Sequence, residues 1–173
     1  YDLSMAIADL IDNSIFANAK NIWIRYGWNE GNPWISILDD GEGMTEDILK
    51  EAMRLGCQNP NEARNPNDLG RFGLGLKTAS FSQCKIVTVH TKTPEGETST
   101  RCWNLDHVER SKKWELGKKA PGGAARIISD INTVPHGTIV LWQGLDRVVG
   151  DDDPDDEDAM NVYYVNEWGQ ISY

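Results

Sequence analysis

The stretch DLGRFGLGLKTASF, residues 68–81, combines three glycines with a lysine and a threonine, a composition suited to binding phosphate. Gly70, Gly73 and Gly75 follow the order G-x-x-G-x-G, which reverses the dinucleotide fingerprint, and no strand precedes them. A P-loop needs its lysine directly after the last glycine, where Leu76 stands. On a helix, a delay of one residue turns that lysine by about 100°. Neither familiar loop fits, and for the glycines alone a plain flexible turn stays an alternative.

Two polar side chains share one face of a helix predicted over residues 3–17. Apolar residues recur there at three- and four-residue spacing, which is typical of an amphipathic helix. Asp9 and Asn13 are four residues apart and therefore neighbours on the helix surface. They border the apolar stripe, where a carboxylate and a carboxamide are costly unless they serve a site. The alternative is that both lie at the shoulder of the helix and meet water.

A third polar segment, Asp39-Asp-Gly-Glu-Gly43, ends a hydrophobic strand. Glycines allow the backbone to approach a ligand closely. An aspartate at the end of a strand can accept a hydrogen bond from an amino group. A simple Asp-Gly turn is the alternative interpretation.

The three segments, in this order and spacing, resemble the ATP-binding domain of the GHKL superfamily, also called the Bergerat fold, over about residues 3–146. This superfamily includes the gyrase B subunit, the MutL mismatch-repair ATPases, the MORC ATPases, the ninety-kilodalton heat-shock chaperones and the sensor histidine kinases. The stretches ADLIDNS, ANAKNIWI and GRFGLGLKTAS are most similar to the MutL and MORC branch, and HGTIVLW resembles the family's late strand. The resemblance implies a histidine kinase-like ATP-binding domain.

The resemblance also implies a role for each matching residue. Asn13 matches the family's magnesium-binding asparagine, whose amide oxygen is a suitable hard ligand. Asp39 matches the aspartate that recognises the adenine amino group, and Thr138 a threonine near it. Lys77 matches a lysine of the MORC-like branch that balances phosphate charge. The remaining implied ATP contacts come from the adenine pocket and from lid amides at a helix start: Gly41, Gly43, Met44, Gly70, Arg71, Phe72, Gly73, Leu74 and Gly75.

Asp9 is the implied catalytic residue, and it stands where most hydrolytic members carry glutamate as general base. Its carboxylate is one methylene shorter, and a misplacement of about 1 Å can cost about 100-fold in rate. We therefore expect Mg²⁺-dependent ATP binding with slow hydrolysis, in which Asp9 orients water. Phe16 and Asn18 also depart from the Asp and Gly of many relatives, and Asn tolerates the left-handed backbone that Gly would supply.

Three functions stay open at this stage. In the first, ATP orders a lid over residues 56–75, and lid closure acts as a conformational or dimerisation switch. This predicts an ATP-dependent homodimer and an unknown downstream domain or protein partner. The second is a histidine-kinase catalytic domain. The third is a module that holds ATP without turning it over.

The elements that must position these residues follow from the remaining pattern. Residues 21–38 read as a hairpin, and Thr45 caps a helix near 46–55. A helix is predicted over 75–83, and strands over 85–91, 99–105, 125–129 and 137–142. Helices that are few and early, with antiparallel strands late, predict an α+β fold. We expect a two-layer sandwich with a mixed, mostly antiparallel sheet and helices on one face.

Charge divides the 173-residue chain into two expected parts. The net charge is −10, and residues 151–158 hold seven acidic side chains, which leaves −3 for the remainder. We expect a GHKL-type ATP-binding domain over 1–150 and an acidic linker or tail over 151–173 that leads towards a domain not in this chain. An acidic chain is a poor binder of phosphate backbones. Direct nucleic-acid binding is therefore not expected.

Composition also bears on the compartment. No apolar run approaches the roughly 20 residues that span a membrane, so no membrane partner is expected. Cys57, Cys84 and Cys102 are dispersed and odd in number, which indicates reduced thiols and a cytoplasmic location rather than a zinc site. The chain begins at Tyr1 without a methionine, and we expect a piece of a longer protein.

Overall fold

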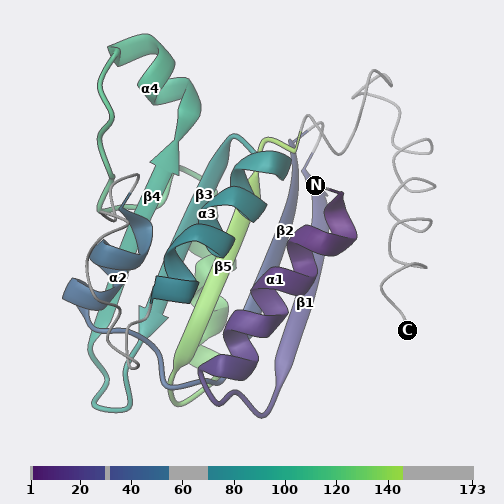
Figure 1. Ribbon diagram of the computed structural model, residues 1–173, viewed down its shortest axis with the longest axis vertical. Helices are drawn as coiled ribbons and strands as arrows, with labels where there is room; N and C mark the ends of the chain where they lie inside the picture. Colours follow the sequence, from purple (N-terminus) through teal and green to yellow (C-terminus); the bar gives the residue numbers. More distant parts are fainter. Residues whose placement is uncertain (1, 30–31, 55–69, 146–173) are drawn as a thin grey trace.

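The computed structural model describes residues 2–29, 32–54 and 70–145. Within these ranges the chain forms, in order, α1 (Leu3–Phe16), β1 (Ile22–Asn29), β2 (Asn32–Asp39), α2 (Glu46–Met53), α3 (Gly70–Gln83), β3 (Ile86–Lys92), β4 (Thr98–Asn104), α4 (Leu105–Ser111), α5 (Ala124–Ile128), the 3-10 helix η1 (Ser129–Thr133) and β5 (Gly137–Gln143). The strands form one sheet in the order β1-β2-β5-β3-β4, and every pairing is antiparallel (Figure 1). The expected α+β sandwich is confirmed.

Helix α1 begins at Leu3 as the sequence predicts and ends at Phe16, one residue before the predicted end. The Asp2 carboxylate caps its start by accepting a hydrogen bond from the amide of Met5 at 2.8 Å. The helix buries a stripe of apolar side chains against the sheet, and Ser14 lies on that same stripe. After its last turn Asn18 adopts φ 60°, a left-handed conformation that asparagine tolerates well.

Both faces of the sheet are covered, which explains why residues 33–39 of β2 are all buried. One face packs against α1, α2 and α3, and contributes Ile35, Ile37, Val87 and Trp142 to the main core. The short helices α5 and η1, which the sequence did not predict, cover part of the opposite face, where they contact Trp34, Leu38, Ile139 and Leu141. No helix within the described ranges is both long and apolar enough to cross a membrane.

Two predicted elements need correction. Residues 125–128 form most of α5 and Ser129 begins η1, where a strand was predicted over 125–129. A short apolar run carries no periodicity that separates helix from strand, and Ala124 and Ile127 bury one helical face. Helix α3 begins at Gly70, five residues earlier than predicted. Each glycine in a helix costs about 1 kcal/mol relative to alanine. Packing of α3 beside α1 offsets that cost.

The strands define two ends of the sheet, and the functional candidates gather at one of them. Thr138 pairs with Asp39 on one side and with Thr91 on the other, and these three residues mark the first end. Gln143 and Ile86 mark the opposite end. Figure 1 shows that α1 finishes and α3 starts at the first end. Two helix termini therefore lie toward the end of the sheet that carries Asp39.

Candidate functional site

Asp39, the last residue of β2, is the centre of the candidate site. The residue is only 6% exposed, and three hydrogen-bond donors hold its side chain. Oδ1 accepts hydrogen bonds from the amides of Gly41 at 2.9 Å and Thr138 at 3.2 Å. Oδ2 accepts one from the hydroxyl of Ser14 on α1 at 2.9 Å. Burial raises the pKa of Asp39, and these hydrogen bonds oppose the rise. The result is a fixed carboxyl group whose Oδ2 keeps capacity to accept a further donor.

Glycine is required where the backbone segments of this end press together. Gly137 has φ 148°, and a Cβ there would lie 1.9 Å from the carbonyl oxygen of Asp39. Gly43 has φ 67°, and a Cβ there would lie 2.2 Å from the carbonyl oxygen of Lys92. At Gly41 the nearest atom to a Cβ is the carbonyl oxygen of Ala17, at 2.8 Å. Each of these glycines thus permits a close approach within the chain itself.

The hydroxyl of Thr91 on β3 joins the turn after β2 to the start of β5. It accepts a hydrogen bond from the amide of Met44 at 2.8 Å and lies 3.1 Å from the carbonyl oxygen of Gly137, to which it donates. The hydroxyl of Thr138 is 3.2 Å away from it. Met44 and Thr138, two predicted site residues, are therefore fixed by a buried threonine that the sequence analysis did not single out.

The neighbouring Asp40 has a different task. Its carboxylate accepts hydrogen bonds from the amides of Lys20 and Asn21 at 2.7 and 2.8 Å and from the Asn21 side chain at 2.8 Å. These bonds hold the pKa of Asp40 below its ordinary value. Asp40 thus ties the turn between α1 and β1 to the end of β2, and His136 makes a short contact through Nδ1 with the carbonyl oxygen of Gly41 beside it.

Asp9 and Asn13 lie on one side of the buried stripe of α1, and both are half-buried. Asn13 directly precedes Ser14, the residue that donates to Asp39. Asp9 lies one helical turn further from the Asp39 end. The half-buried amide of Asn13 presents an oxygen that suits a hard cation such as Mg²⁺. The predicted carboxylate and carboxamide are thus carried by the helix that contacts Asp39.

Helix α3 brings its N-terminus to this end of the sheet (Figure 1). The first four amide groups of a helix have no intrahelical acceptor and favour anions, and here they belong to the segment that starts at Gly70. Gly73 and Gly75 also lie in this helical backbone, whereas the side chains of Arg71, Phe72 and Leu74 lie outside the description.

Lys77 lies further along α3, and its Nζ donates to the carbonyl oxygen of Arg54 just after α2. Burial lowers the pKa of Lys77. In this arrangement the ammonium group joins α3 to the end of α2, so its predicted contact with phosphate stays a prediction.

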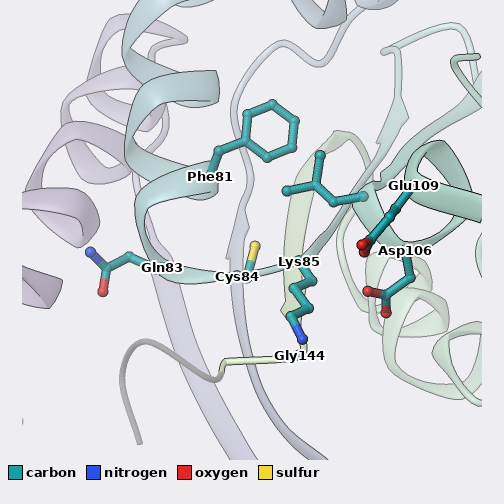
Figure 2. A pocket seen from close by; sticks show the side chains of 8 residues that line it. Phe81, Gln83, Cys84, Lys85, Asp106, Glu109 and Gly144 are labelled. Atoms are coloured by element: carbon teal, nitrogen blue, oxygen red, sulfur yellow. The ribbon is translucent and has the colours of Figure 1, made fainter. Parts of the chain in front are cut away.

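A cavity of about 240 Å³ lies at the opposite end of the sheet (Figure 2). Its lining comes from the end of α3, from the link between α3 and β3, from α4 and from the chain just after β5: Phe81, Gln83, Cys84, Lys85, Leu105, Asp106, Glu109 and Gly144. None of the predicted site residues is among them. Burial of the Cys84 thiol raises its pKa, so this sulfur is not a ready nucleophile.

Three residues of the candidate site were missed by sequence reasoning. Ser14 could have been found, because a hydroxyl on the buried stripe of a helix needs a partner. Gly137 directly precedes the predicted Thr138, and a Gly-Thr pair at a strand start is a detectable signal. Thr91 carries no such signal, since only the register of β3 against β5 brings it to the site.

The fold is an α+β sandwich in which a buried aspartate at a strand end is hydrogen-bonded to the helix beside it. Glycine turns surround the carboxyl group of this aspartate. Together these features are those of the GHKL-type ATP-binding domains. The family described as histidine kinase-, DNA gyrase B- and HSP90-like ATPase matches residues 1–138. The chain belongs to this family, as its motifs predicted.

Curated relatives come from several branches of that family. The chaperone protein HtpG of Clostridium acetobutylicum is 29% identical over 121 residues, which cover 65% of this chain and 19% of the chaperone. The MORC family CW-type zinc finger protein 3 of Mus musculus is 33% identical over 92 residues, covering 52% of this chain and 10% of that protein. The DNA mismatch repair protein MutL of Dictyoglomus turgidum is 34% identical over 89 residues, covering 50% and 15%. The matches thus span a tenth to a fifth of these relatives, and two of the three are consistent with the MutL and MORC branch.

Proposed function

We propose that this domain binds ATP with Mg²⁺ and hydrolyses it slowly. The observation that carries the proposal is the carboxyl group of Asp39, fixed by Ser14, Gly41 and Thr138 with an acceptor position left on Oδ2. A buried acceptor of this kind selects a ligand that brings its own donor, because an unpaired partner would be costly there. The 6-amino group of adenine supplies such a donor.

The triphosphate would lie between α1 and the start of α3. The amides of Gly70 and the residues after it provide donors for the phosphates, and the helix dipole favours their charge. Asn13 would hold Mg²⁺ through its amide oxygen, and Lys77 would balance charge after leaving Arg54. When bound, Mg²⁺ neutralises charge on the phosphate oxygens. Gly43 and Met44 would border the base.

Asp9 is the proposed catalytic residue, with its carboxylate orienting the attacking water. It lies one turn from Asn13 on the same face of α1, and so on the same side as the proposed metal ligand. The short side chain favours a second candidate function, in which the domain binds ATP as a switch without turnover. Measured phosphate release at saturating ATP separates the two.

The experiment compares wild type, Asp9→Ala and the control Asp12→Ala, whose side chain is exposed on the same helix. We expect Asp9→Ala to abolish phosphate release while calorimetry shows an ATP affinity close to that of wild type. Asp12→Ala should retain both properties. Unchanged turnover in Asp9→Ala would show that Asp9 does not have this role. A wild type that gives no heat of binding with Mg-ATP would contradict the proposal as a whole.

The proposal includes a nucleotide-driven switch. The predicted lid, residues 56–75, lies outside the described residues except where α3 begins at Gly70. Ordering of this segment by the γ-phosphate would change its contacts with a second subunit or with a downstream domain. In this proposal the protein is cytoplasmic, its ATP-binding unit spans residues 1–150, and its acidic part spans residues 151–173. Sedimentation with a non-hydrolysable ATP analogue tests the homodimer: the expected result is a shift to the dimer mass, and an unchanged monomer contradicts it.

A further inference from the structure

A short basic strip follows α4 along the outer edge of β4. We call residues 112–119 the lysine strip. Four of its eight residues are lysines, and Glu115 is its single acid, so it carries +3 in a chain of net charge −10. The lysines, Lys112, Lys113, Lys118 and Lys119, are all exposed. The acidity of the whole chain therefore conceals a local surface of the opposite sign.

The backbone of the strip is held against the sheet. Lys112 ends α4 in the left-handed conformation, with φ 57°. Gly117 exchanges both backbone hydrogen bonds with Cys102 of β4, at 2.8 and 2.9 Å. The ring of Trp114 meets that of Trp103 edge-on at 6.0 Å between centroids, although Trp114 stays 66% exposed. The lysines thus project from a fixed track that runs next to an exposed indole.

The positive charge of the strip is only weakly compensated within the described ranges. Glu115 contacts His107 at 3.4 Å, and Glu46 of α2 pairs with Arg101, which lowers the pKa of Glu46 with a smaller contribution from the charge of Lys118. Within the described ranges, no carboxylate lies within ion-pairing distance of the four ammonium groups. The strip is therefore open to an anionic occupant.

We propose that this occupant is the chain's own acidic run, residues 151–158. The run carries seven negative charges in eight residues, a length and sign that match the strip. Each exposed ion pair is weak and screened by salt. Both partners belong to one chain, so their effective concentration is high, and several pairs can form together. We expect this combination to be sufficient for docking.

The chain is long enough for this contact. Leu141 pairs with Thr88, Thr88 with Cys102 and Cys102 with Gly117, three lateral steps of about 4.8 Å each. Leu145 lies four residues beyond Leu141, so it is roughly 20 Å from the strip. Six residue steps from Leu145 to the start of the acidic run span about 20 Å. The run can reach the strip without displacing a strand.

Carbodiimide crosslinking of the 173-residue chain tests the proposal, because this reagent joins only amines and carboxylates already in contact. The monomer is isolated after reaction at low and at high salt, and crosslinked peptides are mapped by mass spectrometry. Lys85 is the matched control, since its amide bonds to the carbonyl oxygen of Gly144 at 3.0 Å and a tethered run without preference meets it first. Lys20, exposed beyond α1, reports random encounter.

We expect crosslinks between the acidic run and the four strip lysines to exceed those to Lys85 and Lys20 several-fold, and to fall several-fold at high salt. Dominant crosslinking to Lys85, an even spread over all lysines, or yields unchanged by salt would each overturn the docking.

A second arm tests nucleic acid as the occupant, with a duplex oligonucleotide as probe. Replacing the seven acidic residues of the run by their amides should expose the strip and tighten duplex binding, and changing the four strip lysines to glutamine in that background should remove the gain. A wild type that already binds the duplex as tightly as the variant with the amide run overturns the proposal, because its strip is then open.

Discussion

The substitution Asp39→Asn isolates the chemical property on which ATP recognition would depend. The side-chain oxygen of asparagine must stay at the position of Oδ1, because the amides of Gly41 and Thr138 donate to it. The new amino group then replaces Oδ2 and faces the hydroxyl of Ser14, 2.9 Å away. That hydroxyl can accept this bond and donate instead to the carbonyl oxygen of Leu10, at 3.2 Å. The fold therefore loses no partner.

Recognition of adenine changes far more than the fold does. In the variant, the amino group of residue 39 and the 6-amino group of adenine would both be donors. The complex loses a hydrogen bond to a charged acceptor, which contributes about 1.5–3 kcal/mol, and this loss corresponds to a decrease in affinity of about 10- to 150-fold. The repulsion between the two donors adds to it.

Calorimetry with two nucleotides separates this effect from general damage. Purine riboside triphosphate lacks the 6-amino group, so wild type should bind it more weakly than ATP by a similar factor. The Asn variant should show little preference between the two. Urea denaturation should show that the Asn variant is at least as stable as wild type at neutral pH, because the buried charge is removed and no hydrogen-bond partner is lost. An Asn variant that keeps the wild-type preference for ATP refutes the role of Asp39.

Three further predictions concern the frame around the site. Gly137→Ala should lower the free energy of unfolding by about 3 kcal/mol or more, because the new Cβ would lie 1.9 Å from the carbonyl oxygen of Asp39. The control Gly96→Ala should lower it by about 1–2 kcal/mol, because Gly96 has φ 88° but nothing within 4 Å of a Cβ. Equal losses of the two variants in urea denaturation would contradict this. Because burial raises the pKa of Asp39, the folded state keeps the proton of this carboxyl group to higher pH than the unfolded chain does. The free energy of unfolding should therefore fall as pH rises from about 4 through the folded pKa. Asp39→Asn should remove that fall in urea titrations across this pH range. Leu49→Ala on α2 should cost about 2–5 kcal/mol because its side chain is fully buried, whereas its exposed neighbour Ile48→Ala should cost much less in the same titration.

The sequence predicted those elements whose signals are local. The apolar stripe of α1 and the pairing of the first two strands are each encoded by neighbouring residues, and both appear where expected. Thr45, predicted as a cap, accepts a hydrogen bond from the amide of Ile48 at the start of α2. Asp39 was locally visible as an aspartate at a strand end, and its place in the site was implied by the family resemblance.

The remaining features depend on contacts that no local window contains. Thr91 belongs to the site only because β3 pairs with β5 in one register. Residues 125–129 are helical because Ala124 and Ile127 find Trp34 and Leu141 on the second face of the sheet, a face that the sequence pattern did not reveal. The early start of α3 likewise depends on the helix beside it, since glycine propensity alone opposes it.

Asp39 and Asp40 show why position in the fold assigns chemistry more firmly than residue type. The two carboxyl groups are adjacent, yet burial raises the pKa of Asp39, whereas hydrogen bonds from the chain at the protein surface lower the pKa of Asp40. A strand end turns consecutive side chains to opposite sides. One therefore points to the buried hydroxyl of Ser14, and the other to the exposed amides before β1. The carboxyl group that is costly to keep charged is also the one for which a ligand is proposed, a relation more typical of a recognition site than of a structural tie.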